Sequence, residues 1–353
     1  MRKTVVGVAI CCGSTLMTFA APRSTSASLA GGRPGEKHLA NIRQLTAGGT
    51  NAEAYFSADG QWLIFQSTRR GRACDQEYVM RVDGTGLQQV STGTGKTTCG
   101  WFFDHDRRIF FASTHAADTA CPPRPDPSKG YVWGLDPFDI YTANRDGSNL
   151  QRLTTFGVYT AEGTLSPDGR TIVFTSLKDG DLDIYTMSVD GTNLRQLTNT
   201  PGYDGGPTYS PDGSKIVYRA YHPTDSAELA DYRSLLAQHI VRPNKMEIWI
   251  MNADGSDQHQ ITQLGGANFA PSFTPDGRRI IFSSNYRNPR GPGARNFDLY
   301  LIDLDGSHLE QVTNDPEFDG FPMFSPDGKH LVWESGRNAP PGELNVFVAD
   351  WRK

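Results

Sequence analysis

Two histidines and an arginine are the side chains of this sequence best suited to chemistry. His115 and His222 each stand just after an apolar run, and Arg219 lies at the end of the run before His222. Four carboxylates stand near the start of other apolar runs: Glu53, Glu162, Asp204 and Asp319. A neutral histidine beside a carboxylate can act as a general base, and two histidines with carboxylates can hold a divalent metal. The alternative is that both histidines only bond to loop backbone.

Motifs of several enzyme classes are missing from the sequence. Residues 95–97 read Gly-Lys-Thr, but the glycine that a phosphate-binding loop requires five residues earlier is Val90. No Gly-x-Ser-x-Gly occurs, nor a pair of histidines one helical turn apart. We therefore favour a non-catalytic protein, and the only cofactor we consider is a divalent metal.

A recurring turn motif defines the elements that must position these residues. Ser-Pro-Asp-Gly or a close variant occurs at 57–60, 166–169, 210–213, 274–277 and 325–328, with a degenerate copy at 104–107. Each copy is followed by an apolar strand such as Ile172, Val173 and Phe174. A second strand, an Asp-Gly turn and a strand ending in Gln-Leu-Thr or a variant complete the unit. Four short strands joined in this way are typical of one propeller blade.

The number of units predicts the architecture. Six units are present, and the sixth ends at residues 344–351 without its fourth strand. Residues 41–46 carry the missing Gln-Leu-Thr strand, so pairing of the two ends would close the ring and hide its open edges. We expect an all-β, six-bladed β-propeller with terminal strand closure, formed by residues 31–353 as a single domain. A two-sheet sandwich is the alternative.

These repeats resemble the TolB-type propeller of the Gram-negative periplasm, and the resemblance covers nearly all of residues 41–351. It implies the fold more strongly than the function, because blades of this kind also occur in peptidases, lyases and other secreted proteins. TolB has an α/β domain ahead of its propeller. Here only about ten residues separate Gly31 from the first strand, so the resemblance does not by itself imply the docking role of TolB.

Strand order assigns the long insertions to one face. Residues 114–137, 220–245 and 285–296 all connect the second and third strands of a blade, and these connections lie on the face opposite the short turns. Within the insertion of the fourth blade, Leu229, Tyr232 and Leu235 have helical spacing, with Asp225 or Ser226 as the cap. Binding sites are commonly built from loops on a rigid scaffold, so this helix is either a packed ornament or a lid that contacts ligand.

Comparison of the blades separates architecture from candidate function. A polar residue that opens nearly every third strand is interpreted as structural hydrogen bonding: Glu77, Asp139, Asp183, Glu247, Asp298 and Asn345. The position of the two histidines carries other residues in other blades, including Arg69, Lys178 and Arg337. The predicted binding residues on the insertion-bearing face are therefore His115, His222, Arg219, Glu53, Glu162, Asp204, Asp319, Arg69, Lys178 and Arg337.

Three cysteines follow the N-terminal segment, so one disulfide and one free thiol are expected in an oxidising compartment. Cys74 and Cys121 lie in connections between second and third strands, and Cys99 lies at the start of a first strand. A Cys74–Cys99 bridge is preferred because it ties the first blade to the second, and Cys99–Cys121 is the alternative.

The first thirty residues are interpreted as a cleaved signal peptide. Arg2 and Lys3 precede a short apolar stretch, and the small residues Ser28 and Ala30 fit cleavage before Gly31. No apolar run of about 18 residues follows, so we expect no membrane span in the mature chain. The net charge of −5 gives no basic footprint for nucleic acid. We expect a monomer in the periplasm or outside the cell.

Three functions are compatible with these observations. The first is non-catalytic binding of a protein, peptide or glycan on the insertion-bearing face. The second is a metal-assisted polysaccharide or oligosaccharide lyase or hydrolase on that face, because oligogalacturonate lyases have related repeats with a histidine-rich metal site. The third is a Tol–Pal-like envelope component.

Overall fold

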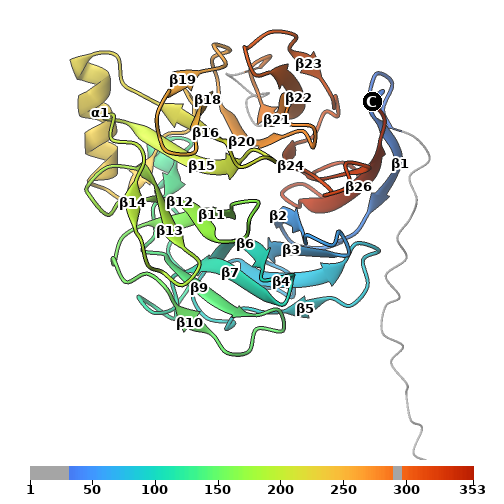
Figure 1. Ribbon diagram of the computed structural model, residues 1–353, viewed down its shortest axis with the longest axis horizontal. Coiled ribbons are helices and arrows are strands. Elements are labelled where there is room, and N and C mark those ends of the chain that lie inside the picture. The colour runs from blue at the N-terminus through green and yellow to red at the C-terminus, as the bar shows by residue number, and fades with distance from the viewer. Residues whose placement is uncertain (1–31, 289–295) are drawn as a thin grey trace, which may run out of the picture.

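Six four-stranded antiparallel sheets arranged in a ring make up the protein. The computed structural model describes residues 32–288 and 296–353. The predicted signal peptide and part of the fifth-blade insertion lie outside these residues. In Figure 1 the first strands of the sheets surround the centre of the molecule, and each contacts the first strands of its neighbours. The prediction of a six-bladed propeller is confirmed.

The strands of each blade run from the centre outward. Blade 1 holds β2 (Asn51–Phe56), β3 (Trp62–Ser67), β4 (Gln76–Arg81) and β5 (Gln88–Gln89). Blade 2 holds β6 (Thr97–Phe103), β7 (Arg108–Ser113), β9 (Asp139–Asn144) and β10 (Gln151–Arg152). Blade 3 holds β11 (Thr160–Leu165), β12 (Thr171–Ser176), β13 (Asp183–Ser188) and β14 (Arg195–Gln196).

The last three blades repeat this order. Blade 4 holds β15 (Tyr203–Tyr209), β16 (Lys215–Tyr221), β18 (Glu247–Asn252) and β19 (His259–Gln260). Blade 5 holds β20 (Asn268–Phe273), β21 (Arg279–Ser284), β22 (Asp298–Asp303) and β23 (Glu310–Gln311). Blade 6 holds β24 (Asp319–Phe324), β25 (His330–Ser335), β26 (Asn345–Trp351) and β1 (Leu39–Gln44).

The recurring turns join first and second strands and lie on one face, which we call the turn face. Ser166 Oγ donates to Asp168 (2.6 Å), and the amide of Thr171 donates to Ser166 Oγ (2.9 Å). The same two bonds form in blades 1, 4, 5 and 6. The glycine that ends the turn, Gly213 in blade 4, has a φ of +73° and lies against Pro167 of the preceding blade. The motif therefore forms the turn and also fits one blade to the next.

Blades 1 and 2 replace this proline–glycine contact with hydrogen bonds. Blade 1 has Ala58 where the motif has proline, so the backbone N–H at this position is free to donate. In blade 2 strand pairing aligns residues 103–106 with the motif, one residue earlier than predicted, so Asp106 stands where the motif has glycine, with a φ of +62°. The carboxylate of Asp106 accepts from the amides of Ala58 (2.8 Å) and Asp59 (2.9 Å). The two departures from the motif therefore compensate one another.

The sixth sheet is assembled from both ends of the described chain. Strand β1 pairs antiparallel with β26, with Arg43 opposite Val348 and Gln44 opposite Phe347. Figure 1 shows blue β1 alongside red β26 near the C-terminus. Burial of Leu39 and Ile42 in the core of blades 5 and 6 completes this sheet. The predicted closure of the ring is confirmed.

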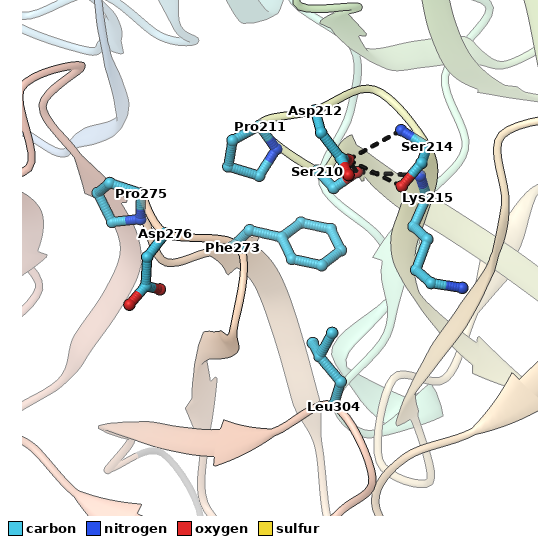
Figure 2. Close-up of a pocket in the computed structure, with 10 residues that line it drawn as sticks. Ser210, Pro211, Asp212, Ser214, Lys215, Phe273, Pro275, Asp276 and Leu304 are labelled. Atoms are coloured by element: carbon cyan, nitrogen blue, oxygen red, sulfur yellow. Dashed lines mark hydrogen bonds between the residues drawn. The ribbon is translucent and has the colours of Figure 1, made fainter.

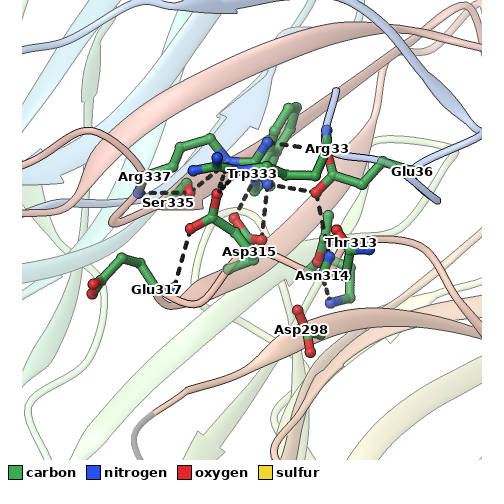
Figure 3. Close-up of polar contacts among 12 residues, drawn as sticks. Arg33, Glu36, Asp298, Thr313, Asn314, Asp315, Glu317, Trp333, Ser335 and Arg337 are labelled. Carbon is green, nitrogen blue, oxygen red and sulfur yellow. Dashed lines mark hydrogen bonds and ion pairs between the residues drawn. The ribbon is translucent and has the colours of Figure 1, made fainter. Parts of the chain in front are cut away.

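A buried ionic cluster fastens the segment before β1 to the last two blades. Arg337 donates to Glu36 (3.0 Å) and to Asp319 (2.9 Å), and Arg33 pairs with Asp315 (2.7 Å), as Figure 3 shows in part. The side chains of Glu36, Asp315 and Asp319 are fully buried. Because a buried carboxylate without a cation is strongly destabilising, Arg337 has a structural role in ring closure.

The insertions of blades 2 and 4 lie on the opposite face, which we call the insertion face. The predicted helix is present as α1 (Ser226–Leu236), capped by Asp225, with Tyr232 and Leu235 buried. Strand β8 (Trp133–Gly134) of the blade 2 insertion pairs with β17 (Ile240–Val241) of the blade 4 insertion. We call residues 114–137 and 220–245 together the cap. Among the described residues, no helix is both long and apolar enough to cross a membrane.

The expected Cys74–Cys99 bridge is wrong, and so is the Cys99–Cys121 alternative. Cys74 is bonded to Cys121, with 5.8 Å between their Cα atoms, and Cys99 is a buried free thiol. The reason is the direction of the first strand of blade 2, which turns Cys99 toward the propeller axis, away from the loops that carry the other two. The disulfide ties the base of the cap to blade 1.

Grooves between neighbouring blades open on the turn face. Figure 2 shows the groove between blades 4 and 5, about 420 Å³ in volume, with Phe273 and Leu304 beneath the prolines Pro211 and Pro275. A second groove lies at the equivalent place between blades 6 and 1, next to Phe56 and Pro326. Because the same repeat elements line both, these grooves are products of blade packing.

Candidate functional site

A β-bulge in every first strand presents one residue toward the propeller axis. The pairing of first and second strands shifts at the same point in all six blades. The residue at the shift has a φ between +51° and +60° in each blade. We call these residues the axial ring: Glu53, Cys99, Glu162, Gly206, Ala270 and Phe321. Glu53 interacts electrostatically with Glu162 of blade 3 and Arg219 of blade 4, so these side chains meet across the axis.

Glu162 and Arg219 form the polar centre of the ring. The guanidinium of Arg219 is paired with Glu162 and also donates to the hydroxyl of Tyr203 (2.6 Å). Thr175 Oγ1 donates to Glu162 at 2.8 Å. A Cβ atom on Gly206 would lie 2.1 Å from Nη1 of Arg219. The glycine in blade 4 thus leaves the space that the guanidinium occupies.

Glu53 and Cys99 occupy the neighbouring ring positions. Burial raises the pKa of Glu53 to about 7, opposed by a hydrogen bond with Cys99 and reinforced by the charge of Glu162. Burial also raises the pKa of the Cys99 thiol well above its usual range, and the charge of Glu53 raises it further. A thiol with a raised pKa is a poor nucleophile, so the geometry favours a binding role for this pair.

Two buried carboxyl groups missed by the sequence analysis lie beside Glu53. Strand pairing places Gln76, and not Glu77, at the position of Asp139 and Asp183. The predicted polar position therefore exists, but Glu77 does not belong to it. Its true equivalents are the apolar residues Ile140, Ile184, Ile248, Leu299 and Val346. Glu334 is fully buried on β25, and burial raises the pKa of Glu77 and Glu334 well above the usual range.

Aromatic side chains form the other half of the site. Phe321 of the ring lies near Phe269 and Phe318, with ring centroids 5.4 and 6.2 Å apart. Trp133 reaches from the blade 2 insertion to Phe269 of blade 5, at 6.0 Å and edge-on. The same indole lies 5.1 Å from the guanidinium carbon of Arg219. The cap therefore extends over the ring, with Trp133 as its inward side chain.

The structure gives both predicted histidines a role within their own blades. The ring of His115 lies 4.3 Å from that of Tyr141, and Ser113 bonds its Nδ1 (2.7 Å). His222 bonds Asp204 (2.9 Å) and lies 4.8 Å from the ring of Trp249. Burial lowers the pKa of His115. These contacts do not bring the histidines together with the axial ring.

The residues that replace the histidines in other blades behave similarly. An aromatic residue stands two positions into the third strand of each blade: Tyr78, Tyr141, Tyr185, Trp249, Tyr300 and Phe347. Arg69 lies over Tyr78 at 5.6 Å and Arg337 over Phe347 at 5.9 Å. Lys178 pairs with Asp179 at 2.9 Å. A contact that recurs in most blades indicates architecture.

Asp204 and Asp319 lie two positions before the ring position of their strands. They take the place that Asn51 has in blade 1, and both are fully buried. Asp319 accepts from Trp333 Nε1 at 3.0 Å in addition to Arg337. Of the predicted residues, the structure thus brings together Glu53, Glu162 and Arg219. No group of three or more His, Cys, Asp or Glu side chains within residues 32–288 and 296–353 is arranged to hold a metal ion.

Comparisons with known proteins agree with the fold. A family model described as the TolB beta propeller domain matches residues 138–224 and 241–350. An uncharacterized protein of Agrobacterium fabrum is 30% identical over 95 residues, which are 27% of this chain and 30% of that protein. The protein TolB homolog of Chlorobium luteolum is 27% identical over 161 residues, covering 35% of this chain and 36% of that protein. The chain thus spans about a third of the length of these curated relatives.

Solved structures show the same architecture at low identity. TolB from Acinetobacter baumannii aligns with a TM-score of 0.53 and 17% identity, over 86% of this chain and 65% of that one. An oligogalacturonate lyase in complex with manganese aligns with a TM-score of 0.51 and 13% identity, over 88% and 93%. At these identities the likeness is one of fold.

Proposed function

Because the chain belongs to the TolB beta propeller domain family, we propose that it is a non-catalytic binding propeller of the cell envelope. Its ligand, a protein, a peptide or a glycan, binds on the insertion face. The signal-like sequence of the first thirty residues supports a periplasmic or secreted location.

The cap is the observation that carries this proposal. The turn face repeats one contact from blade to blade, whereas the insertion face carries two long connections that meet through β8 and β17. The cap is itself packed, since Tyr232, Val241 and Leu135 share one buried cluster. Tyr131 of the cap is 58% exposed and accepts a hydrogen bond from Trp133 (3.0 Å). An exposed aromatic side chain on ordered loops is a common component of binding surfaces.

A lyase has less support from the same geometry. The two histidines pack against aromatic rings of separate blades, and the solved lyase is similar in fold alone. Incubation with uronate oligosaccharides and Mn²⁺ should therefore give no rise in the ultraviolet absorbance of unsaturated products. A rise that disappears in His222→Ala would overturn the proposal.

A Tol–Pal-like role is the second candidate, favoured by the family and by the TolB homolog among the relatives. Since the chain matches about a third of that relative, the partners of the whole protein are part of the proposal. The test is to measure binding of the purified peptidoglycan-associated protein of the Tol–Pal system. Binding would identify the Tol–Pal-like role as a specific case of the envelope-binding function.

The central test compares exposed apolar residues on the two faces. Removing residues 220–245 would also remove Tyr232 and Val241 from a buried cluster, so single changes are preferable. The purified protein, immobilised, captures ligands from an envelope extract. Tyr131→Ser on the cap should reduce capture at least about tenfold if an aromatic anchor is lost.

Leu194→Ser is the matched control, because Leu194 is 39% exposed on the turn face. This variant should capture as much as the unmodified protein. Loss of capture in Leu194→Ser with retention in Tyr131→Ser would place the binding surface on the turn face and refute the proposal.

A further inference from the structure

The axial ring gathers more carboxyl groups than cations. Four carboxyl side chains interact there: Glu53, Glu77, Glu162 and Glu334. In the described part of the chain, the cation in contact with this group is Arg219, and it is already paired with Glu162. The charge of Arg219 also acts on Glu53, but Glu77 and Glu334, which both interact with Glu53, have no cation of their own among the described residues. Such a cluster is stable only in protonated form or with an added cation.

Unpartnered oxygen atoms point to a missing ligand. The carboxyl group of Glu77 is fully buried and packs against Gly100, whose backbone N–H lowers the pKa of Glu77, but no side chain among the described residues donates to either oxygen. One oxygen of Glu334 accepts from the amide of Ala54 (2.8 Å), next to Glu53, while Oε2 of Glu334 has no partner in the same residues. A buried acceptor left unpaired costs about 1–3 kcal/mol, so acceptors that persist here are consistent with a ligand that donates hydrogen bonds.

The aromatic half of the site suits the apolar body of a cation. Phe269 contacts both Phe321 and Trp133, and the guanidinium of Arg219, which pairs with Glu162, lies over the face of Trp133. The attraction of cations to aromatic faces strengthens when water is excluded. A carboxylate and an aromatic face together thus surround the guanidinium of Arg219, and Phe321 occupies the axial-ring position of blade 6, next to blade 1 with Glu53.

Solvent has access to the ring. Glu53, Ala270, Phe321 and Trp133 are partly exposed, in contrast to the fully buried residues around them. A small group can therefore approach Glu53 from beneath the cap without unfolding of a blade.

We propose that the axial ring binds a primary ammonium group, with Glu53 as its counter-ion and Phe321 and Trp133 beside its apolar body. The inference rests on the proposed function and names the ligand chemistry. A lysine side chain and a peptide α-amine share that chemistry. The acidic surplus disfavours a uronate, whose carboxylate would meet carboxyl groups at the same site.

Binding of the cation should release a proton from Glu53. The groups that face Glu53 are Cys99, Glu162, Arg219, Asp75 and Glu334, and Glu77 interacts with it from β4. Since the pKa of Glu53 is raised to about 7, the ammonium must displace the carboxyl proton to the buffer at lower pH. Affinity should rise about tenfold between about pH 6 and about pH 8, as the ionised fraction rises from about a tenth to about nine-tenths.

The test is titration calorimetry of the purified protein with four probes. Nα-acetyl-lysine amide presents the side-chain ammonium, and glycylglycinamide presents the α-ammonium. Nα-acetyl-norleucine amide is the neutral isostere, and galacturonate is the anion. We expect binding of one or both ammonium probes, at least about tenfold weaker binding of the isostere, and no binding of galacturonate. The stronger ammonium probe identifies the source. Equal binding of the isostere, or no ammonium binding, would overturn the inference.

Two variants separate the site from general surface charge. Glu53→Gln should abolish the pH dependence and weaken ammonium binding at least about tenfold at pH 8, whereas Glu317→Gln, an exposed carboxylate on the same face, should do neither. Titrations of the unmodified protein in two buffers of different ionisation enthalpy report proton release without any variant. No proton release near pH 7, or equal losses in both variants, would contradict the proposal.

These outcomes are distinguishable from those of the capture experiment. Capture that depends on Tyr131 without ammonium binding would leave the binding function standing and remove the inference. Ammonium binding with capture that is independent of Tyr131 would place the partner surface elsewhere while retaining the ring as a site.

Discussion

The two faces of the propeller are built from the same repeats, but they differ in how many features depart from the repeat pattern. On the turn face, the serine and aspartate side chains of the turns bond within their own turn, and in blades 1, 4, 5 and 6 the turn glycine lies against a proline of the preceding blade. On the insertion face, within the described residues, the cap has no counterpart in the other blades, the axial-ring position carries a different residue in nearly every blade, and buried carboxyl groups lack cations. Regularity thus indicates structure, and departures from it indicate candidate function.

The largest test of this comparison changes the same position in two blades. Arg337→Leu removes the cation from the buried carboxylates Glu36 and Asp319, so it should lower the free energy of unfolding by about 3–5 kcal/mol. Arg69→Leu, at the equivalent place in blade 1, loses a contact with Tyr78 and should cost about 1 kcal/mol or less. Urea unfolding of both variants measures the difference. Equal losses of unfolding free energy in the two variants would show that the shared position in the blade, and not the buried carboxylates around Arg337, determines the contribution of the arginine to stability.

The axial ring should make stability depend on pH. Glu53 has a pKa raised from 4.5 to about 7, so the folded protein holds a proton that the unfolded chain loses. Stability therefore falls as pH rises between about 4.5 and about 7, by at most about 3 kcal/mol from this group. Burial also raises the pKa of Asp183 and of Asp298 to about 7, so these groups add to the same fall of stability with rising pH.

Glu53→Gln should remove the share of that slope that belongs to Glu53, measured as the difference in unfolding free energy between the two proteins across the pH range. Parallel curves for the variant and the unmodified protein would mean that Glu53 titrates normally in the fold.

Substitution of Glu77 tests whether a residue that departs from the repeat lowers the stability of the fold. Its equivalents in other blades are isoleucine, leucine or valine, so Glu77→Ile should restore the repeat. Removing a fully buried carboxyl group that has no cation and no side-chain donor among the described residues should stabilise the protein by about 1–3 kcal/mol. Thermal and urea unfolding measure the gain. Destabilisation would show that Glu77 has a structural partner that the geometry does not display.

The smallest effect is expected on the turn face, where two substitutions should cancel. Ala58→Pro removes one donor to Asp106 and should cost about 1 kcal/mol. Adding Asp106→Gly recreates the proline and glycine contact of the other blades and should recover most of the loss. A double-mutant cycle measures the coupling, and simple additivity would contradict the compensation.

The sequence predicts features with a local or repeating signal and misses those that depend on contacts between distant segments. Strand number, ring closure and the Asp225 cap of α1 follow from periodicity and composition, which act locally. The Cys74–Cys121 pairing and the two-residue strands β8 and β17 depend on how distant loops meet, which has no local signal. Glu77 was misplaced by a single residue, which in a strand reverses the side chain to the other face. Careful alignment of Glu77 with Ile140 and Ile184 would have revealed a carboxyl group at an apolar position.

The pairing of β1 with β26 has a consequence for how the molecule is made. The earliest strand to emerge from the ribosome or a translocation pore must wait for the latest, because its hydrogen-bonding partner is synthesised last. Blades 1 to 5 can gather while the ring is still open, with the edges of blades 1 and 5 exposed. Completion of the ring is then one late step, and a chain without residues 345–351 would lose the pairing partner of its first strand as well as its last strand.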